Sequence, residues 1–338
     1  MAVADFLEGK DVVPIYAEIS PVAYCNHRCV FCNYNYLGHK GKFPEGRMVS
    51  LVEELAEAGV KSVVFAGSGE PTIHPDTMPA IENAKKAGLD VAMSTNGALL
   101  NDEAIEIVVK SLTWIRFSFS GGNPENYAKV HSTKESDYHL VLNNIKKMKA
   151  FKDKTGSNLT IGTQFVLLPE NSEYVVSQAK IMKECGADYF VVKHFYESET
   201  SELQIDDSFR TPELLASLKK AAQELSDDKF SFIVRDVAHL ERTRRYAMCY
   251  GLPFIVYFRE DGEVYTCFFY QQDKNTSLGS IVNQAFKELW RSEGNRKAID
   301  YINEKIDKDK CQANCRHHQI NNYLWDLRHN QPEHINFI

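Results

Sequence analysis

Short runs of β-branched and aromatic residues alternate with amphipathic helical patterns over more than half of the chain. This rhythm is typical of βα units that surround a parallel sheet. Gly59, Gly88 and Gly186 each follow a helical pattern, at the position where the left-handed end of a helix favours glycine. The pattern predicts strands over residues 16–19, 62–65, 90–94, 114–118, 159–168 and 189–195, with helices over 48–58, 79–87, 102–109, 140–151 and 173–184 between them.

Beyond residue 197 the pattern changes. Residues 198–245 are polar and helical in pattern, so we expect a connector with a helix over 212–225 that Thr211 caps. The apolar runs 254–258 and 264–268 flank an Asp-Gly pair, which is a hairpin signal. The chain is therefore predicted to have a core over 1–197, a helical connector over 198–245, and a small domain over 246–338 that holds the hairpin and helices over 282–290 and 295–306.

The predicted core belongs to the α/β class. Its six βα units are two short of an eight-stranded barrel, and the alternation alone fits an open doubly wound sheet equally well. In either architecture, ligands bind at the carboxyl ends of the parallel strands. Residues that directly follow a strand are therefore the first candidates for chemistry.

Bulk composition excludes some partners. The 338 residues carry a net charge of −7, which gives no general attraction to a phosphate backbone, so we expect no nucleic-acid partner. No apolar run approaches the roughly 20 residues that span a bilayer, and the first residues lack the features of a secretory signal. We expect a cytoplasmic protein with no membrane partner, in which eight cysteines indicate metal ligation more than disulfides.

Three of these cysteines, Cys25, Cys29 and Cys32, lie within eight residues. A [4Fe–4S] cluster normally takes four thiolates, so a local set of three leaves one iron open to another ligand. A structural zinc site is the alternative, but it needs a fourth ligand nearby. His27 lies in the same loop, but it is better suited to contact a ligand residue or solvent than to bind the metal itself.

The spacing C-x3-C-x2-C, with Phe31 before the third cysteine, resembles the signature of the radical S-adenosylmethionine (SAM) enzymes. The resemblance implies that the open iron chelates the amino and carboxylate groups of SAM. Electron transfer from the reduced cluster then yields a 5′-deoxyadenosyl radical, which abstracts hydrogen from an unactivated C–H bond. It further implies a partial (β/α)6 TIM-like barrel, and a flavodoxin or ferredoxin as the electron donor.

Polar and small residues after the next strands extend this resemblance. The run Gly67-Ser68-Gly69-Glu70-Pro71 resembles the GGE motif of the family, in which the carboxylate accepts from the amino group of SAM. Taken singly, such residues are ordinary strand-end turns. The resemblance places Phe31, Gly67, Gly69, Glu70, Ser94, Asn96, Ser118, Ser120 and Gln164 at the SAM site.

Four further cysteines, Cys249, Cys267, Cys311 and Cys315, could form a second, closed metal site. The segment from residue 278 to 290 resembles the hairpin-then-helix element of SPASM and twitch domains, which hold auxiliary [4Fe–4S] clusters. The cysteine count fits the twitch form with one cluster, although its final pair has two intervening residues and this chain has three. Zinc is the alternative metal. With four thiolates the site has no open iron, so electron transfer and structural support are its expected roles.

Three residues near the sixth strand remain to be assigned. Cys185 precedes that strand, away from the ligand-binding edge, and we expect it to pack in the core rather than to return hydrogen to a substrate radical. At the opposite end, Lys193 suits an anionic or hydroxyl-bearing group, and His194 suits a base for an alcohol proton. Weaker candidates for the substrate site are Tyr270, Gln271, Gln272 and Arg316.

The leading hypothesis is a radical SAM enzyme that abstracts hydrogen from a carbinol carbon of a small polar substrate. A sugar, nucleotide-sugar or aminocyclitol would then be dehydrogenated or epimerised. The first alternative is a SPASM-type maturase of ribosomal peptides, which often has a leader-recognition domain before the cysteine loop, and only 24 residues precede Cys25 here. The second is a non-catalytic metal-binding protein, which would not need Glu70 and Asn96.

Overall fold

The computed structural model describes residues 2–35, 38, 40–197, 201–235, 244–312, 315–330 and 334. Its strands form one sheet of ten, in the order β10-β9-β8-β1-β2-β3-β4-β5-β6-β7. All neighbours from β8 to β7 are parallel, and β9 and β10 continue the sheet in antiparallel fashion. The strands are β1 (Tyr16–Ile19), β2 (Ser62–Phe65), β3 (Asp90–Thr95), β4 (Trp114–Ser118), β5 (Thr160–Leu167), β6 (Tyr189–His194), β7 (Ser231–Val234), β8 (Ile255–Phe258), β9 (Glu263–Tyr265) and β10 (Ser277–Ser280).

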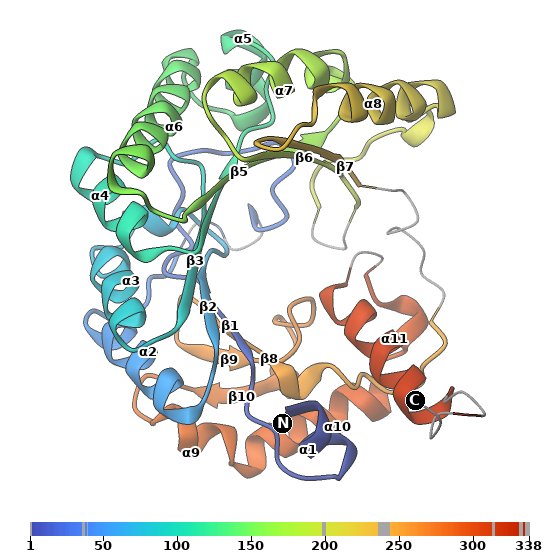
Figure 1. Ribbon diagram of the computed structural model, residues 1–338. Coiled ribbons are helices and arrows are strands. Elements are labelled where there is room, and N and C mark those ends of the chain that lie inside the picture. The colour runs from blue at the N-terminus through green and yellow to red at the C-terminus, as the bar shows by residue number, and fades with distance from the viewer. Residues whose placement is uncertain are drawn as a thin grey trace.

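The sheet curves into an arc with helices along its outer side (Figure 1). Within the described ranges β7 and β10 do not pair with each other, so the arc is a partial barrel. No described helix has the length and apolar character needed to cross a bilayer. The helices are α1 (Ala2–Leu7), α2 (Arg47–Ala58), α3 (Thr77–Lys86), α4 (Asp102–Ser111), α5 (Pro124–His131), α6 (Glu135–Thr155), α7 (Val175–Glu184), α8 (Pro212–Leu225), α9 (Phe286–Trp290), α10 (Glu293–Lys305) and α11 (Arg316–His329).

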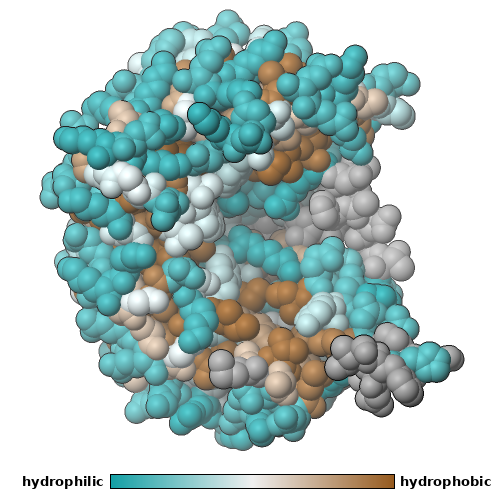
Figure 2. Space-filling model, in the orientation of Figure 1, coloured by the Kyte–Doolittle hydropathy of each residue, from teal (hydrophilic) through white to brown (hydrophobic). Residues whose placement is uncertain are grey.

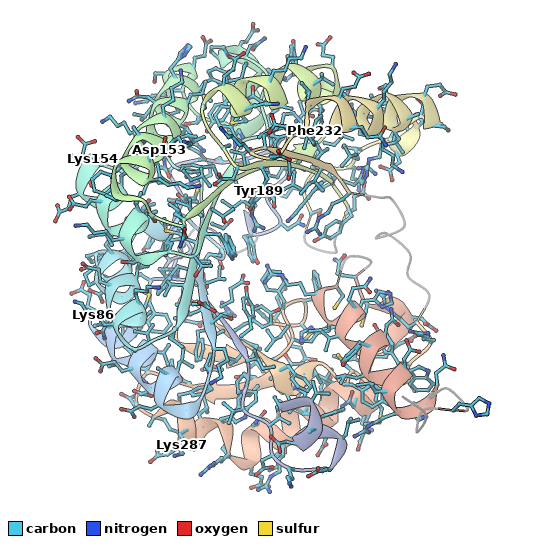
Figure 3. All side chains as sticks on the ribbon, viewed as in Figure 1. Lys86, Asp153, Lys154, Tyr189, Phe232 and Lys287 are labelled. Atoms are coloured by element: carbon cyan, nitrogen blue, oxygen red, sulfur yellow. The ribbon has the colours of Figure 1, made fainter. Side chains whose placement is uncertain are left out.

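The alternation of side chains along each strand separates the core from the concave face. On β4, Ile115 and Phe117 are fully buried in the main apolar cluster, whereas Trp114, Arg116 and Ser118 line the concave side. Figure 3 shows Lys86, Lys154 and Lys287 on the outer helices, pointing away from the sheet. The apolar core therefore lies between the sheet and the helices, and the inner face of the arc is left for polar residues.

The predicted alternation and the partial barrel are confirmed, and the sheet has two features that were not predicted. In the connector, β7 adds a further parallel strand beside β6. Residues 198–200 and 236–243 of this connector lie outside the described part of the chain. In the C-terminal segment, β8 pairs in parallel with β1, so the hairpin extends the barrel sheet. Cys185 follows α7 in the apolar core, as predicted.

Candidate active site

A cavity of about 1510 Å³ occupies the concave face of the arc. Its walls come from the carboxyl ends of the barrel strands on one side and from the C-terminal segment on the other. The hollow is visible between the two arms of the molecule in Figure 2. Cys25, Cys29 and Cys32 line it, and so do Lys193 and Arg316.

Backbone contacts fix the cysteine loop that follows β1. The N–H of Glu70 donates to the carbonyl of Tyr24 (2.7 Å), and the N–H of Val30 donates to the carbonyl of Val130 (3.0 Å). A Cβ on Gly69 would lie 2.0 Å from the Tyr24 carbonyl oxygen, so only glycine permits this approach. Gly67 has a φ of 112°, and a Cβ there would lie 2.4 Å from the Ser20 side chain. The two glycines thus seat the loop after β2 against the segment that leads into the cysteines, and both line the cavity.

The three N-terminal thiols fit an iron–sulfur cluster. All are free, and burial is the main reason that the pKa of Cys25 rises to about 11 and that the pKa of Cys29 lies well above its usual value. The Cys32 thiol raises both pKa values as well, because neighbouring thiolates repel each other. Three such thiolates are stable together only with a cationic centre among them.

Glu70 and Asn96 connect this loop to the ends of β2 and β3. The Glu70 carboxylate is buried and accepts from the hydroxyl of Thr95 (2.6 Å), from the N–H of Asn96 (2.7 Å), and from the N–H (3.1 Å) and hydroxyl (2.7 Å) of Thr72. The Asn96 amide donates to Asn26 (2.7 Å) and faces the Cys25 sulfur at 3.7 Å. Only one of these donors reaches Oε2 of Glu70, which keeps acceptor capacity toward a cationic ligand.

The other expected SAM residues divide into two groups. Phe31, Ser94, Ser118 and Gln164 line the cavity, and within the described part of the chain the buried Oε1 of Gln164 has no hydrogen-bond partner. Ser120 is fully buried and does not line the cavity. Its hydroxyl oxygen accepts from the N–H of Val166 (3.0 Å), which is a structural contact.

His131, which sequence reasoning did not single out, lies directly behind the cysteine loop at the end of α5. Its Nε2 accepts from the N–H of Ser120 (2.9 Å), so the ring proton is on Nδ1. Nδ1 is 3.1 Å from the Cys29 sulfur and donates to it. Burial lowers the pKa of His131 to about 3, which keeps the ring neutral. His27 is buried against the same ring rather than exposed to solvent.

The four C-terminal cysteines form a second site. Burial, together with the neighbouring Cys315 and Cys311, raises the pKa of Cys249 to about 12. Cys249 and Cys315 act in the same way on the buried Cys267, so the four thiols face one another. The Asn321 amide donates to the Cys249 sulfur (3.3 Å). This closed set of four soft ligands fits an iron–sulfur cluster or zinc.

Charged side chains fill the space between the two thiol sites. Arg316 donates to the hydroxyl of Tyr16 (3.0 Å) and to Glu18, and this contact ties α11 to β1. Lys193 lines the cavity from β6. The ring Nε2 of His194 donates to the carbonyl of Arg235 (2.8 Å). Of the weaker candidates, Tyr270, Gln272 and Arg316 line the cavity and Gln271 does not.

Comparisons with known proteins agree with this arrangement. Residues 19–177 match the model of the radical SAM superfamily, and residues 249–317 match that of the SPASM iron–sulfur cluster-binding domain. The chain belongs to the radical SAM superfamily. Like its relatives, it has a [4Fe–4S] cluster that binds SAM and an auxiliary cluster in a SPASM-like domain.

Curated relatives of this radical SAM protein are distant in sequence. A tungsten-containing aldehyde ferredoxin oxidoreductase cofactor-modifying protein of Pyrococcus furiosus is 22% identical, over 82% of this chain and 81% of its own. A GTP 3′,8-cyclase of Aquifex aeolicus is 25% identical, over 82% of this chain and 89% of its own. Among solved structures, Streptococcus suis SuiB bound to S-adenosylmethionine has a TM-score of 0.70 at 16% identity, and covers 94% of this chain and 77% of SuiB. anSMEcpe with bound AdoMet has a TM-score of 0.63 at 19% identity, and covers 90% of each chain.

The hydrogen bond from His131 to Cys29 gives a prediction for this radical SAM protein. An N–H donor to a cluster thiolate favours the reduced, more negative state of the cluster. We therefore expect His131→Leu to shift the midpoint potential of the SAM-binding cluster to a more negative value, and His131→Gln, which keeps a donor, to shift it less. His139→Ala, at an exposed position of α6, is the matched control. An EPR-monitored redox titration measures the shift, and equal potentials in all four proteins would contradict the assignment.

Proposed function

We propose that this radical SAM enzyme abstracts hydrogen from a carbinol C–H of a small polar substrate, such as a sugar, nucleotide-sugar or aminocyclitol, and thereby dehydrogenates or epimerises it. The observation that carries the proposal is the polar, charged inner face between the two thiol sites, where Lys193, Arg316 and Glu18 lie. Cys25, Cys29 and Cys32 would hold the SAM-binding cluster, and Cys249, Cys267, Cys311 and Cys315 the auxiliary one.

Bound SAM and the reduced cluster supply the hydrogen-abstracting radical, and the residues of the chain position the substrate. Phe31, Glu70, Ser94, Asn96, Ser118 and Gln164 would hold SAM along one wall. Lys193 would bind a substrate oxygen, and His194 would accept the carbinol proton. Because Nε2 of His194 already donates to the Arg235 carbonyl, the proton would have to reach Nδ1.

The auxiliary site favours an oxidative outcome. Its four thiols leave no position for a substrate group when all bind the metal, so the remaining role toward the reaction is to take up an electron. Removing hydrogen and then an electron from a carbinol carbon, with loss of the hydroxyl proton, gives a ketone. Dehydrogenation is therefore the simplest net reaction, with a flavodoxin or ferredoxin in the cytoplasm as the proposed electron donor.

The rival proposal is peptide modification. The name of the Aquifex aeolicus relative, a GTP cyclase, supports a small-molecule substrate. SuiB has also been solved with a precursor peptide, but at 15% identity that likeness concerns the fold alone. The polar, charged inner face suits a small substrate with hydroxyl and ionic groups better than an apolar peptide side chain.

Deuterium transfer tests the proposal. The reconstituted enzyme is incubated anaerobically with SAM, dithionite and a panel of carbinol-deuterated sugar phosphates, nucleotide-sugars and aminocyclitols. We expect one class to yield 5′-deoxyadenosine that is one mass unit heavier, because the abstracted deuterium stays on the nucleoside. Transfer from none of these compounds, but from a deuterated peptide, would establish the rival.

A further inference from the structure

Arg116 and Lys193 line the concave face of the sheet, and a glycine on the strand between them leaves room for an aromatic ring. Arg116 on β4 is the register partner of Gly162 on β5. Gly162 is in turn the register partner of Tyr189 on β6. A Cβ on Gly162 would lie 1.9 Å from the ring of Tyr189, so the glycine lets this ring extend across β5 toward Arg116. Figure 3 labels Tyr189 on the inner curve of the sheet. Lys193 lies four residues further along β6, toward the mouth of the cavity.

Neither side chain forms an ion pair in the described part of the chain. Arg116 is partly buried, it makes a long hydrogen bond to the Ser94 hydroxyl (3.4 Å), and its buried Nε has no partner among the described residues. Lys193 has neither a hydrogen bond nor an ion pair to any residue that the structure describes. Burying a cation without a partner costs several kcal/mol, by rough estimate, and such groups are rarely kept without a ligand.

The surroundings of Lys193 are strongly positive. Burial lowers the pKa of Lys193 to about 6, and Arg116, Arg235 and Arg316 lower it as well. The Glu18 carboxylate raises the pKa of Lys193, but it already accepts hydrogen bonds from Arg316 and Tyr16. An anion between Arg116 and Lys193 would supply the missing charge.

We propose that Arg116 and Lys193 form an anion-binding subsite, and that the substrate carries a phosphate or carboxylate group that fills it. The inference rests on the proposed function, because it assigns this group to the substrate of that reaction. The planar guanidinium of Arg116 can bind two oxygens of an oxyanion side by side, and the Lys193 ammonium adds a point charge.

The anion belongs to the substrate rather than to SAM. The groups that act on Lys193 and Arg116 come from β1, β4, β6, α11 and the residue that follows β7. Those that act on Cys25 are a different set, Glu70, Cys32, His27 and Asn96. Arg316, on the C-terminal segment, acts on both Arg116 and Lys193, whereas the SAM carboxylate is expected at the cysteine loop.

Binding of simple oxyanions tests the subsite without turnover. Sulfate, inorganic phosphate and malonate are titrated calorimetrically into the SAM-bound holoenzyme at constant ionic strength. We expect saturable binding that weakens about tenfold or more in Arg116→Gln and in Lys193→Met, because each loses a charge-assisted contact. Lys297→Met, on the exposed face of α10, is the control and should bind as the wild type does. Tighter binding of phosphate than of malonate identifies a phosphorylated substrate, and the reverse identifies a carboxylate.

The pH dependence of sulfate binding gives a second readout, since sulfate keeps its charge from pH 5 to 9. Above pH 6 the Lys193 amine of the free protein is mostly deprotonated. Lys193 must therefore take up a proton when sulfate binds. The affinity should fall by up to tenfold per pH unit as the pH rises above 6, and should be flat in Lys193→Met. The facing groups Arg116, Arg235, Arg316 and Glu18 are present in both proteins, which isolates the contribution of Lys193.

The outcomes separate this inference from the proposed function. Lys193→Met replaces a buried amine that has no partner among the described residues with an apolar side chain, so its unfolding temperature should not fall, and a loss of binding cannot then be attributed to misfolding. Loss of sulfate binding on addition of SAM would overturn the inference, since the cations would then hold the SAM carboxylate. Absence of binding, or binding unaffected by both substitutions, would also overturn it. Anion binding without deuterium transfer from any carbinol would leave the subsite standing and reject only the proposed reaction.

Discussion

Replacing Cys29 by alanine is expected to reduce the formation of 5′-deoxyadenosine to the background rate. The Cys29 sulfur accepts from His131 and is near the thiols of Cys25 and Cys32. Its loss therefore removes one cluster ligand and the hydrogen bond that holds this part of the loop to His131. Chromatography of anaerobic reactions with SAM and dithionite measures the nucleoside. Cys25→Ala and Cys32→Ala should behave in the same way, because each thiolate binds one iron.

Cys185→Ala is the matched control for these substitutions. Cys185 is only 3% exposed and lies in the apolar core between α7 and β6, outside the cavity lining. Its replacement should lower the free energy of unfolding by about 1 kcal/mol and leave 5′-deoxyadenosine formation in place. Full SAM cleavage by Cys29→Ala, or its loss in Cys185→Ala with cluster content unchanged, would contradict the assignment of the thiols.

Replacing Cys267 by alanine is expected to separate SAM cleavage from product formation. Cys267 is buried among the C-terminal thiols, and its loss should remove about half of the bound iron, since two clusters of equal size are expected. The SAM-binding loop is held by contacts from Glu70 and Val130, so 5′-deoxyadenosine formation should fall far less than formation of the oxidised product.

Metal analysis of the same proteins checks the nature of the second site. The wild type should contain iron and sulfide for two [4Fe–4S] clusters and no stoichiometric zinc, and Cys267→Ala should retain the EPR signal of one cluster. Stoichiometric zinc in the wild type that disappears with Cys267 would show that the C-terminal site is structural. The oxidative role proposed for that site would then be excluded.

Local signals in the sequence were sufficient to find the cysteine loop and the strand-end run around Glu70. The cysteine motif and the run around Glu70 are each confined to a few consecutive residues. Each follows a strand that can be recognised from its apolar residues. The βα alternation predicted the first six strands to within two residues at each end, because each buries one face under a helix.

Features that depend on contacts between distant segments could not be predicted in this way. β7 is only four residues long, and its pairing with β6 is set by the tertiary structure. Likewise, nothing local indicates that β8 would join β1. His131 lies 102 residues from Cys29, and the one sequence signal near it is the end of a helix that begins after Asn123. The close approach of Gly69 to Tyr24 could not be predicted, because it is fixed only by the fold.

The alternation of buried and cavity-lining side chains along β4 shows why the substrate site could not be predicted in full from the sequence. Arg116 stands between buried Ile115 and Phe117, and a charged residue in such a strand is usually a solvated one. Only the curvature of the sheet shows that the opposite face borders a cavity, which Arg116 and Lys193 both line. The sequence identified Lys193 by its position at the end of a strand and Arg316 by its position after a cysteine, but it did not single out Arg116.

The central claim is that the cluster held by Cys25, Cys29 and Cys32 cleaves SAM. The most direct test is to reconstitute the wild type anaerobically and to incubate it with SAM and dithionite in the absence of substrate. The account predicts slow formation of 5′-deoxyadenosine and methionine in equal amounts, dependent on these three cysteines. A protein with full iron and sulfide content that binds SAM but forms neither compound would contradict it.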